Sequence, residues 1–183
     1  SVRRGVLACM DNTGQSCNAP TRMLVPTGRY DEALEIAREV AETLVTGNPE
    51  LEDTQIGPVV SAAQFDKVQR LISSGIEEKA TLVTGGVGRP EHLDKGYFVK
   101  PTIFGGVTPQ MSIFREEIFG PVLSIIAYEN QDEAVNMAND TPYGLAAYVS
   151  GSDNSELMKY ARELRAGQVQ LNYTGGGTNA PFG

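Results

Sequence analysis

The feature that most constrains the fold of this chain is the alternation of short apolar segments with longer amphipathic ones. Pro121–Tyr128 is the most apolar segment and is typical of a buried strand. Tyr30–Leu44 carries its apolar residues on one helical face. Strands joined through helices pair in parallel by right-handed crossovers. We therefore predict an α/β fold of three layers, with a mostly parallel, doubly wound sheet covered by helices on both faces.

The other segments continue this alternation, with Gly, Pro, Asn and Asp between them. Further strands or extended segments are expected at Thr21–Val25, Thr81–Thr84, Phe98–Phe104, Leu145–Ser150 and Gly167–Asn172, and further helices at Ser1–Met10, from an N-cap at Ser61 toward Glu78, and at Asp132–Asn139 and Ser152–Leu164.

Composition narrows the classes of function. The 183 residues are enough for one domain with a full core, and the net charge of −8 opposes nucleic-acid binding. No apolar run approaches the roughly 20 residues that cross a membrane. A single histidine, His92, argues against a histidine-based triad or a multi-histidine metal site, so we expect no metal. With no signal peptide and no disulfide framework, we expect a cytoplasmic protein.

The chemically richest segment surrounds Cys17. It runs from Asn12 to Arg22, between an expected helix and an expected strand, and contains Gly14. A cysteine in such a turn exposes its sulfur beside backbone N–H groups, which can lower the thiol pKa and stabilise an oxyanion. A lone cysteine is as readily a buried structural residue. From this segment alone, the two interpretations are about even.

Four other segments change that balance. Together with Gly14-Gln15-Ser16-Cys17, which is followed by Ala19 and Arg22, they resemble the motifs of the aldehyde dehydrogenase superfamily, in family order and over nearly the whole chain. These segments are Ile56-Gly57-Pro58, Glu116-Glu117-Ile118-Phe119-Gly120-Pro121-Val122, Asn139-Asp140-Thr141-Pro142-Tyr143-Gly144-Leu145-Ala146-Ala147, and Asn172 with Pro181-Phe182-Gly183.

The resemblance implies a role for individual residues. Cys17 corresponds to the nucleophile, which attacks an aldehyde to form a thiohemiacetal and then a thioester, and its own N–H contributes half of the oxyanion hole. Glu117 matches the carboxylate that binds the nicotinamide ribose, and Phe119 matches the aromatic residue packed beside it. Substrate contacts are expected from residues next to the nucleophile and from the tunnel-lining loop: Ser16, Asn18, Asn172, Tyr173 and Thr174. Without the resemblance, Glu117 would be a solvated charge and Phe119 a core residue.

The resemblance also implies what lies outside these residues. In the family, the general base, the asparagine that completes the oxyanion hole and most of the NAD or NADP site lie upstream of the cysteine. We therefore expect residues 1–183 to form a single catalytic domain, a fragment that lacks the NAD(P)-binding domain before it and the oligomerisation tail after it. The isolated chain should not oxidise aldehydes. The full-length protein is expected to be a homodimer or homotetramer.

Two alternatives remain open. Some relatives with this fold pass the acyl group to coenzyme A or reduce an acyl phosphate, although the segments around Cys17 and Glu117 fit the hydrolytic branch better. A cysteine hydrolase or a non-catalytic binding module is the other possibility. A hydrolase normally needs a histidine base, and the setting of His92 gives no sign that it reaches Cys17. The identity of the aldehyde and the choice between NAD and NADP are not encoded in these motifs.

Overall fold

A computed structural model describes residues 1–173 of the chain. These residues divide into two compact units, the first spanning Val2–Ala127 and the second beginning at Tyr128. We describe each unit by itself.

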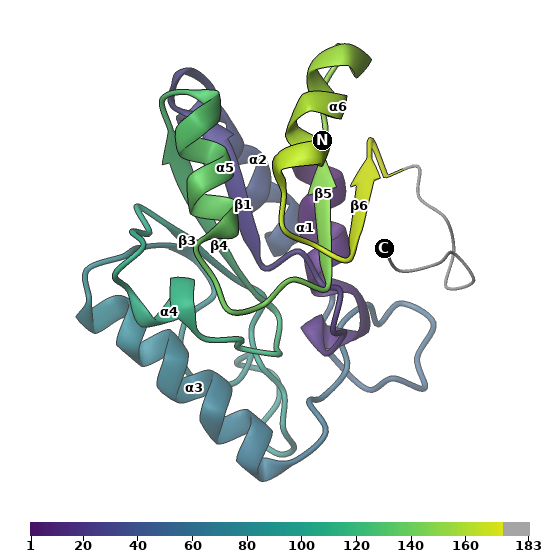
Figure 1. Ribbon diagram of the computed structural model, residues 1–183. Coiled ribbons are helices and arrows are strands. Elements are labelled where there is room, and N and C mark those ends of the chain that lie inside the picture. The colour runs from purple at the N-terminus through teal and green to yellow at the C-terminus, as the bar shows by residue number, and fades with distance from the viewer. Residues whose placement is uncertain (174–183) are drawn as a thin grey trace. The chain divides into compact units, whose positions relative to one another are not determined.

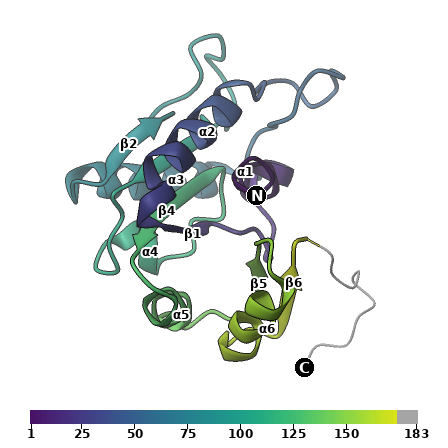
Figure 2. The same ribbon diagram turned by 90° about the horizontal axis from the view of Figure 1, so that it is seen from above.

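The first unit is built on a four-stranded sheet in the order β1-β4-β3-β2. Figure 1 labels β1, β3 and β4 of this sheet, and Figure 2 labels β2. Strands β3 and β4 are parallel, with Thr102 opposite Val122, whereas β2 and β3 are antiparallel. The connection from β2 to β3 contains no helix and simply returns along the sheet, which is why this pair is antiparallel. The strands are β1 (Arg22–Pro26), β2 (Thr81–Thr84), β3 (Thr102–Gly105) and β4 (Val122–Tyr128).

Helices cover both faces of this sheet (Figure 1, Figure 2). Helices α1 (Val2–Met10) and α2 (Tyr30–Glu42) share a core with Ile103 and Leu123. The opposite face meets α3 (Ala62–Glu77) and the single turn α4 (Ser112–Arg115). A side chain at Gly75 of α3 would lie 3.1 Å from the ring of Phe104, so the helix packs tightly on β3. The predicted α/β class and mostly parallel sheet are confirmed.

Local chemistry explains where α3 and β3 begin. The Ser61 hydroxyl accepts a hydrogen bond from the Gln64 N–H, so the predicted N-cap is present. The extended segment predicted from Phe98 becomes a paired strand only at Thr102, because Pro101 has no N–H to donate to a neighbouring strand.

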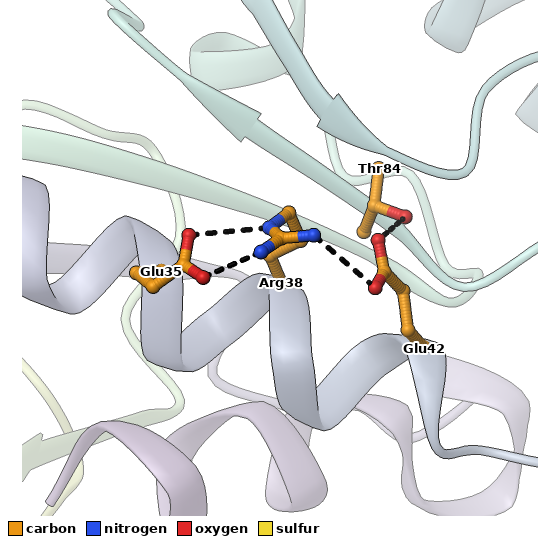
Figure 3. A network of polar contacts seen from close by, with 4 residues as sticks. All are labelled: Glu35, Arg38, Glu42 and Thr84. Carbon is orange, nitrogen blue, oxygen red and sulfur yellow. Dashed lines mark hydrogen bonds and ion pairs between the residues drawn. The ribbon is translucent and has the colours of Figure 1, made fainter.

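The exposed face of α2 carries a row of charges (Figure 3). Arg38 pairs with Glu35 and Glu42, and Glu42 also accepts a hydrogen bond of 3.2 Å from the Thr84 hydroxyl on β2. Exposed pairs of this kind contribute at most about 1 kcal/mol each. Both ion pairs lie within α2, and the hydrogen bond from Thr84 to Glu42 ties the end of the helix to the edge strand.

The second unit contains α5 (Gln131–Asn139), β5 (Ala146–Val149), α6 (Asn154–Glu163) and β6 (Gln168–Leu171). Strands β5 and β6 are parallel, as expected for two strands joined through a helix. The Asn139 side chain donates to the Glu163 carbonyl at 2.9 Å and accepts from the Arg165 N–H at 2.7 Å. It therefore links the end of α5 to the end of α6, which gives this motif residue a structural role.

Candidate functional site

A reversal of the backbone separates α1 from the Cys17 segment. Asn12, Thr13 and Gly14 have φ values of 49°, 60° and 68°, so three successive residues lie in the left-handed region. The Asn12 side-chain amide donates to the Gln15 carbonyl at 3.1 Å, and the Gln15 N–H donates to the Asn12 carbonyl at the same distance. The left-handed run ends the helix and turns the chain outward.

Cys17 lies in the turn that follows. Its side chain is exposed, and the thiol is free. The Ala19 N–H donates to the Ser16 carbonyl at 3.0 Å, which closes the turn around Cys17 and Asn18. Ser16 is half-buried and Asn18 is exposed. The structure thus places both predicted neighbours beside an accessible sulfur.

The Cys17 segment packs directly against the segment that contains Glu117. A Cβ atom at Gly14 would lie 2.1 Å from the carbonyl oxygen of Gly120 and 2.8 Å from the nitrogen of Pro121. This close approach of two backbones requires glycine, and the φ of 68° favours it. Two motifs about a hundred residues apart in the sequence are therefore brought together.

Within the second motif, Glu117 is exposed and Phe119 is half-buried. Phe119 has a φ of 56°, which is unusual for a bulky residue. The Gln64 side-chain amide donates to the carbonyls of Ile118 and Phe119 at 3.0 Å and 2.8 Å. The sequence analysis did not identify Gln64 as a site residue, because nothing in its local pattern points to a partner 54 positions away.

Cys9 has the opposite environment. It is completely buried on α1, and its sulfur lies 3.6 Å from the Val122 carbonyl, to which it donates. Burial raises the pKa of the Cys9 thiol from 9.0 to about 12. Cys9 is therefore a packed thiol, and Cys17 alone of the two is accessible to a substrate.

The remaining predicted substrate residues lie in the second unit. Asn172 exchanges two hydrogen bonds with the backbone of Gly151, at 3.0 Å and 3.1 Å. The Tyr173 ring stacks on Tyr148 with centroids 5.7 Å apart. Both Asn172 and Tyr173 have left-handed backbones, with φ values of 51° and 59°. Thr174 lies outside the described residues.

The first unit also contains a cavity of about 380 Å³ near the end of α2. Glu42, His92 and Lys100 are among its lining residues, and none of the predicted site residues is. A nitrogen of the His92 ring lies 2.9 Å from the Thr46 carbonyl, so that ring is held by the loop.

Among residues 1–173, no cluster of three or more His, Cys, Asp or Glu side chains could hold a metal. No helix in that range is long and apolar enough to cross a membrane.

The sequence model of the aldehyde dehydrogenase family matches residues 1–183, the whole chain. The chain belongs to the aldehyde dehydrogenase family. Among its family relatives, 3-succinoylsemialdehyde-pyridine dehydrogenase from a Pseudomonas species is 49% identical over 183 residues. That match covers 100% of this chain and 38% of the relative, so the chain spans well under half of the dehydrogenase it matches.

Two solved structures show the same relationship. A cysteine-to-alanine mutant of aldehyde dehydrogenase C from Pseudomonas syringae, in complex with NAD+ and octanal, is similar with a TM-score of 0.97 and 50% identity. The match covers 100% of this chain and 38% of the Pseudomonas syringae chain. An aldehyde dehydrogenase from Mycobacterium tuberculosis in complex with NAD+ has a TM-score of 0.93 and 42% identity, with 98% of this chain and 37% of that chain covered.

Proposed function

We propose that these residues form the catalytic domain of an NAD(P)-dependent aldehyde dehydrogenase that oxidises an aldehyde to a carboxylic acid, with Cys17 as the nucleophile. The observation that carries the proposal is an exposed thiol in the turn that follows the left-handed run Asn12–Gly14, together with the close packing of Gly14 against Gly120 in the Glu117 segment. Membership of the family supports the reaction class.

The first step belongs to Cys17. Its sulfur, as the thiolate, attacks the aldehyde carbon, and a C–S bond forms while the carbonyl π electrons move to oxygen. We assign the Cys17 N–H the role of donating a hydrogen bond to that oxyanion. Ser16 and Asn18 flank the sulfur and can contact the substrate on either side. The product of this step is a thiohemiacetal on Cys17.

The exposed carboxylate of Glu117 and the half-buried ring of Phe119 fit a nicotinamide cofactor. A carboxylate accepts hydrogen bonds from ribose hydroxyls, and an aromatic ring offers an apolar surface to the sugar and the nicotinamide. NAD or NADP, when bound, supplies the acceptor for the hydride that leaves the thiohemiacetal carbon. Cys17 then carries a thioester, which water cleaves to a carboxylic acid and a free thiol. No residue of this chain is assigned as the general base for this cleavage.

The assembly and the setting are proposed on the same basis. We place residues 1–183 in one catalytic domain, and we propose a homodimer or homotetramer for the full-length protein, to be checked by light scattering. Cys9 and Cys17 are both free thiols, which supports a reducing, cytoplasmic compartment. Asn172, Tyr173 and Thr174 are proposed to line the aldehyde path.

The test is a chimaera in which residues 1–183 replace the matching segment of 3-succinoylsemialdehyde-pyridine dehydrogenase from the Pseudomonas species. We expect it to form NADH or NADPH when supplied with an aldehyde, and the 183-residue chain alone to form none. Acid quenching during turnover, followed by peptide mapping, should locate an acyl group on Cys17. An acyl group on another residue would overturn the assignment. Release of free acid, rather than of acyl-coenzyme A, distinguishes the hydrolytic reaction from the acylating alternative.

A further inference from the structure

The residues at the start of α3 reach both segments of the site. We call Val60–Gln64 the α3 entry segment. Its Val60 N–H donates to the side-chain oxygen of Gln15 at 2.8 Å, which ties it to the Cys17 loop. Its Gln64 amide donates to the carbonyls of Ile118 and Phe119. One short segment therefore bonds to the nucleophile loop on one side and to the Glu117 loop on the other.

The two bonds from Gln64 use both hydrogens of one amide group. They hold two successive carbonyls that flank the φ of Phe119, which is 56°. A non-glycine residue in the left-handed region is strained, and such a conformation persists only where neighbouring groups enforce it. Gln64 supplies that enforcement from a helix whose N-terminus is itself fixed by the Ser61 cap.

The backbone of Phe119 is also connected to the Cys17 segment, through Gly120 and Gly14. Phe119 leads directly into Gly120, whose carbonyl oxygen leaves no room for a Cβ at Gly14, since such an atom would lie 2.1 Å from it. The other side of Gly120 meets Val68 of α3, where an added Cβ would lie 2.6 Å from a methyl group. A change in the backbone of Phe119 therefore moves the surface on which the Cys17 turn rests.

We propose that Gln64 is a positioning residue, which holds Phe119 in its left-handed conformation and thereby sets both the cofactor-facing loop and the support of the Cys17 turn. This inference deepens the proposed function and rests on it for the roles of Phe119 and Cys17. The structural part, which concerns Gln64, Phe119, Gly120 and Gly14, is testable without any activity.

The first experiment is NMR on the 183-residue chain, whose mass is 19.7 kDa. Gln64→Leu removes both donors, and Gln64→Glu keeps the size but replaces the donor with an acceptor. We expect both changes to shift the backbone resonances of Phe119, Gly120 and Gly14. Gln69→Leu is the matched control, because Gln69 lies on the same helix and bonds instead to the Gly88 N–H. It should leave those three residues unchanged.

A second substitution distinguishes loss of the Phe119 conformation from a general loosening of the fold as the cause of the Gln64→Leu shifts. Glycine adopts the left-handed region without strain. In a Phe119→Gly background, the shift of Gly120 and Gly14 caused by Gln64→Leu should therefore shrink severalfold. Unchanged Phe119 and Gly120 resonances in both Gln64 variants would overturn the proposal. So would an equal shift of Gly120 and Gly14 in the presence and absence of Phe119→Gly.

In the chimaera, Gln64→Leu should raise the KM for NAD about tenfold, with a smaller change in kcat, because the loop that meets the cofactor loses its fixed conformation. Gln69→Leu should leave the KM unchanged. Equal KM values for the two variants would contradict the positioning role. If the chimaera with the unaltered segment shows no turnover, the proposed function fails, and the NMR result still decides whether Gln64 fixes Phe119.

Discussion

The two cysteines of this chain lie eight positions apart and have opposite surroundings. Cys9 is on the apolar side of α1, is completely buried and has a thiol pKa raised to about 12. Cys17 follows a run of three left-handed residues and is exposed in a turn. The chain passes from one environment to the other within a few residues, because the reversal at Asn12–Gly14 takes it from the core to the surface.

This difference shows what makes a thiol available for chemistry. An amphipathic helix buries any thiol that lies on its apolar face, and burial disfavours the thiolate. A turn with backbone N–H groups exposes the sulfur and provides donors for a developing negative charge. The backbone conformation, rather than the side chain, decides which cysteine can act as a nucleophile. The predictions below test this contrast, beginning with the largest expected effect.

Loss of the Cys17 sulfur should abolish turnover, whereas loss of the Cys9 sulfur should not. In the chimaera, Cys17→Ser is expected to lower kcat about 10⁴-fold, because a neutral hydroxyl is a far weaker nucleophile than a thiolate. Cys9→Ala removes a buried sulfur and should leave kcat within about threefold, since its effect is on packing. Steady-state kinetics with an aldehyde and NAD provide the measurement. Similar losses in both variants would mean that the contrast is not catalytic.

Alkylation compares the two thiols in the unmodified chain. At neutral pH, a thiol with a pKa of about 12 is ionised in about one molecule in 10⁵, and Cys9 is also inaccessible. We expect iodoacetamide to modify Cys17 about a thousandfold faster than Cys9, as followed by intact mass and peptide mapping. Urea should remove most of the difference. Equal labelling of both residues in the folded chain would contradict the buried environment of Cys9.

The third prediction concerns the support of the Cys17 turn. Gly14→Ala forces a left-handed alanine into contact with the Gly120 carbonyl, where its Cβ would lie at 2.1 Å. Strain and overpacking together should lower the free energy of unfolding by about 3 kcal/mol. The matched control is Gly28→Ala, because a Cβ there meets nothing within 4 Å. That change should alter stability by about 0.5 kcal/mol or less, as measured by urea denaturation.

Much of the fold could be predicted from the sequence, because periodicity records which side of each element faces the core. The apolar spacing of Tyr30–Leu44 and the apolar run Pro121–Tyr128 predicted α2 and β4 to within a few residues. The single turn α4 was missed, since four residues carry no period. The antiparallel pairing of β2 was also missed, because it depends on the path of a loop that has no regular pattern.

The roles of the candidate site residues stay predictions from the family motifs, whereas the contacts that connect their segments were not predicted at all. The family motifs predicted Cys17, Glu117 and Phe119 as site residues. They did not predict that Gln64 would bond to the backbone on either side of Phe119, because that contact exists only after α3 has packed on the sheet. The left-handed conformation of Phe119 was also unpredictable, since a bulky aromatic residue rarely adopts it. Contacts between distant segments follow from packing, which a local pattern does not record.

The smallest predicted effect is an alkaline loss of stability that originates at Cys9. Because burial raises the thiol pKa from 9.0 to about 12, the folded state holds its proton over a range in which the unfolded chain loses it. The corresponding stability is fully present below pH 9 and is lost as the pH rises toward 12. Between pH 8 and pH 10, the free energy of unfolding should fall by about 1 kcal/mol more in the wild-type chain than in Cys9→Ala.

The comparison with Cys9→Ala is needed because Tyr128 also titrates in this range. Burial and the neighbouring Tyr160 raise the pKa of Tyr128 from 10.0 to about 12, and this contribution is common to both proteins. Urea denaturation at several pH values would give the difference directly. Parallel pH profiles for the wild-type chain and Cys9→Ala would mean that the Cys9 thiol ionises in the fold as readily as in the unfolded chain. In that case, the contrast between the two cysteines would rest on access to reagents alone.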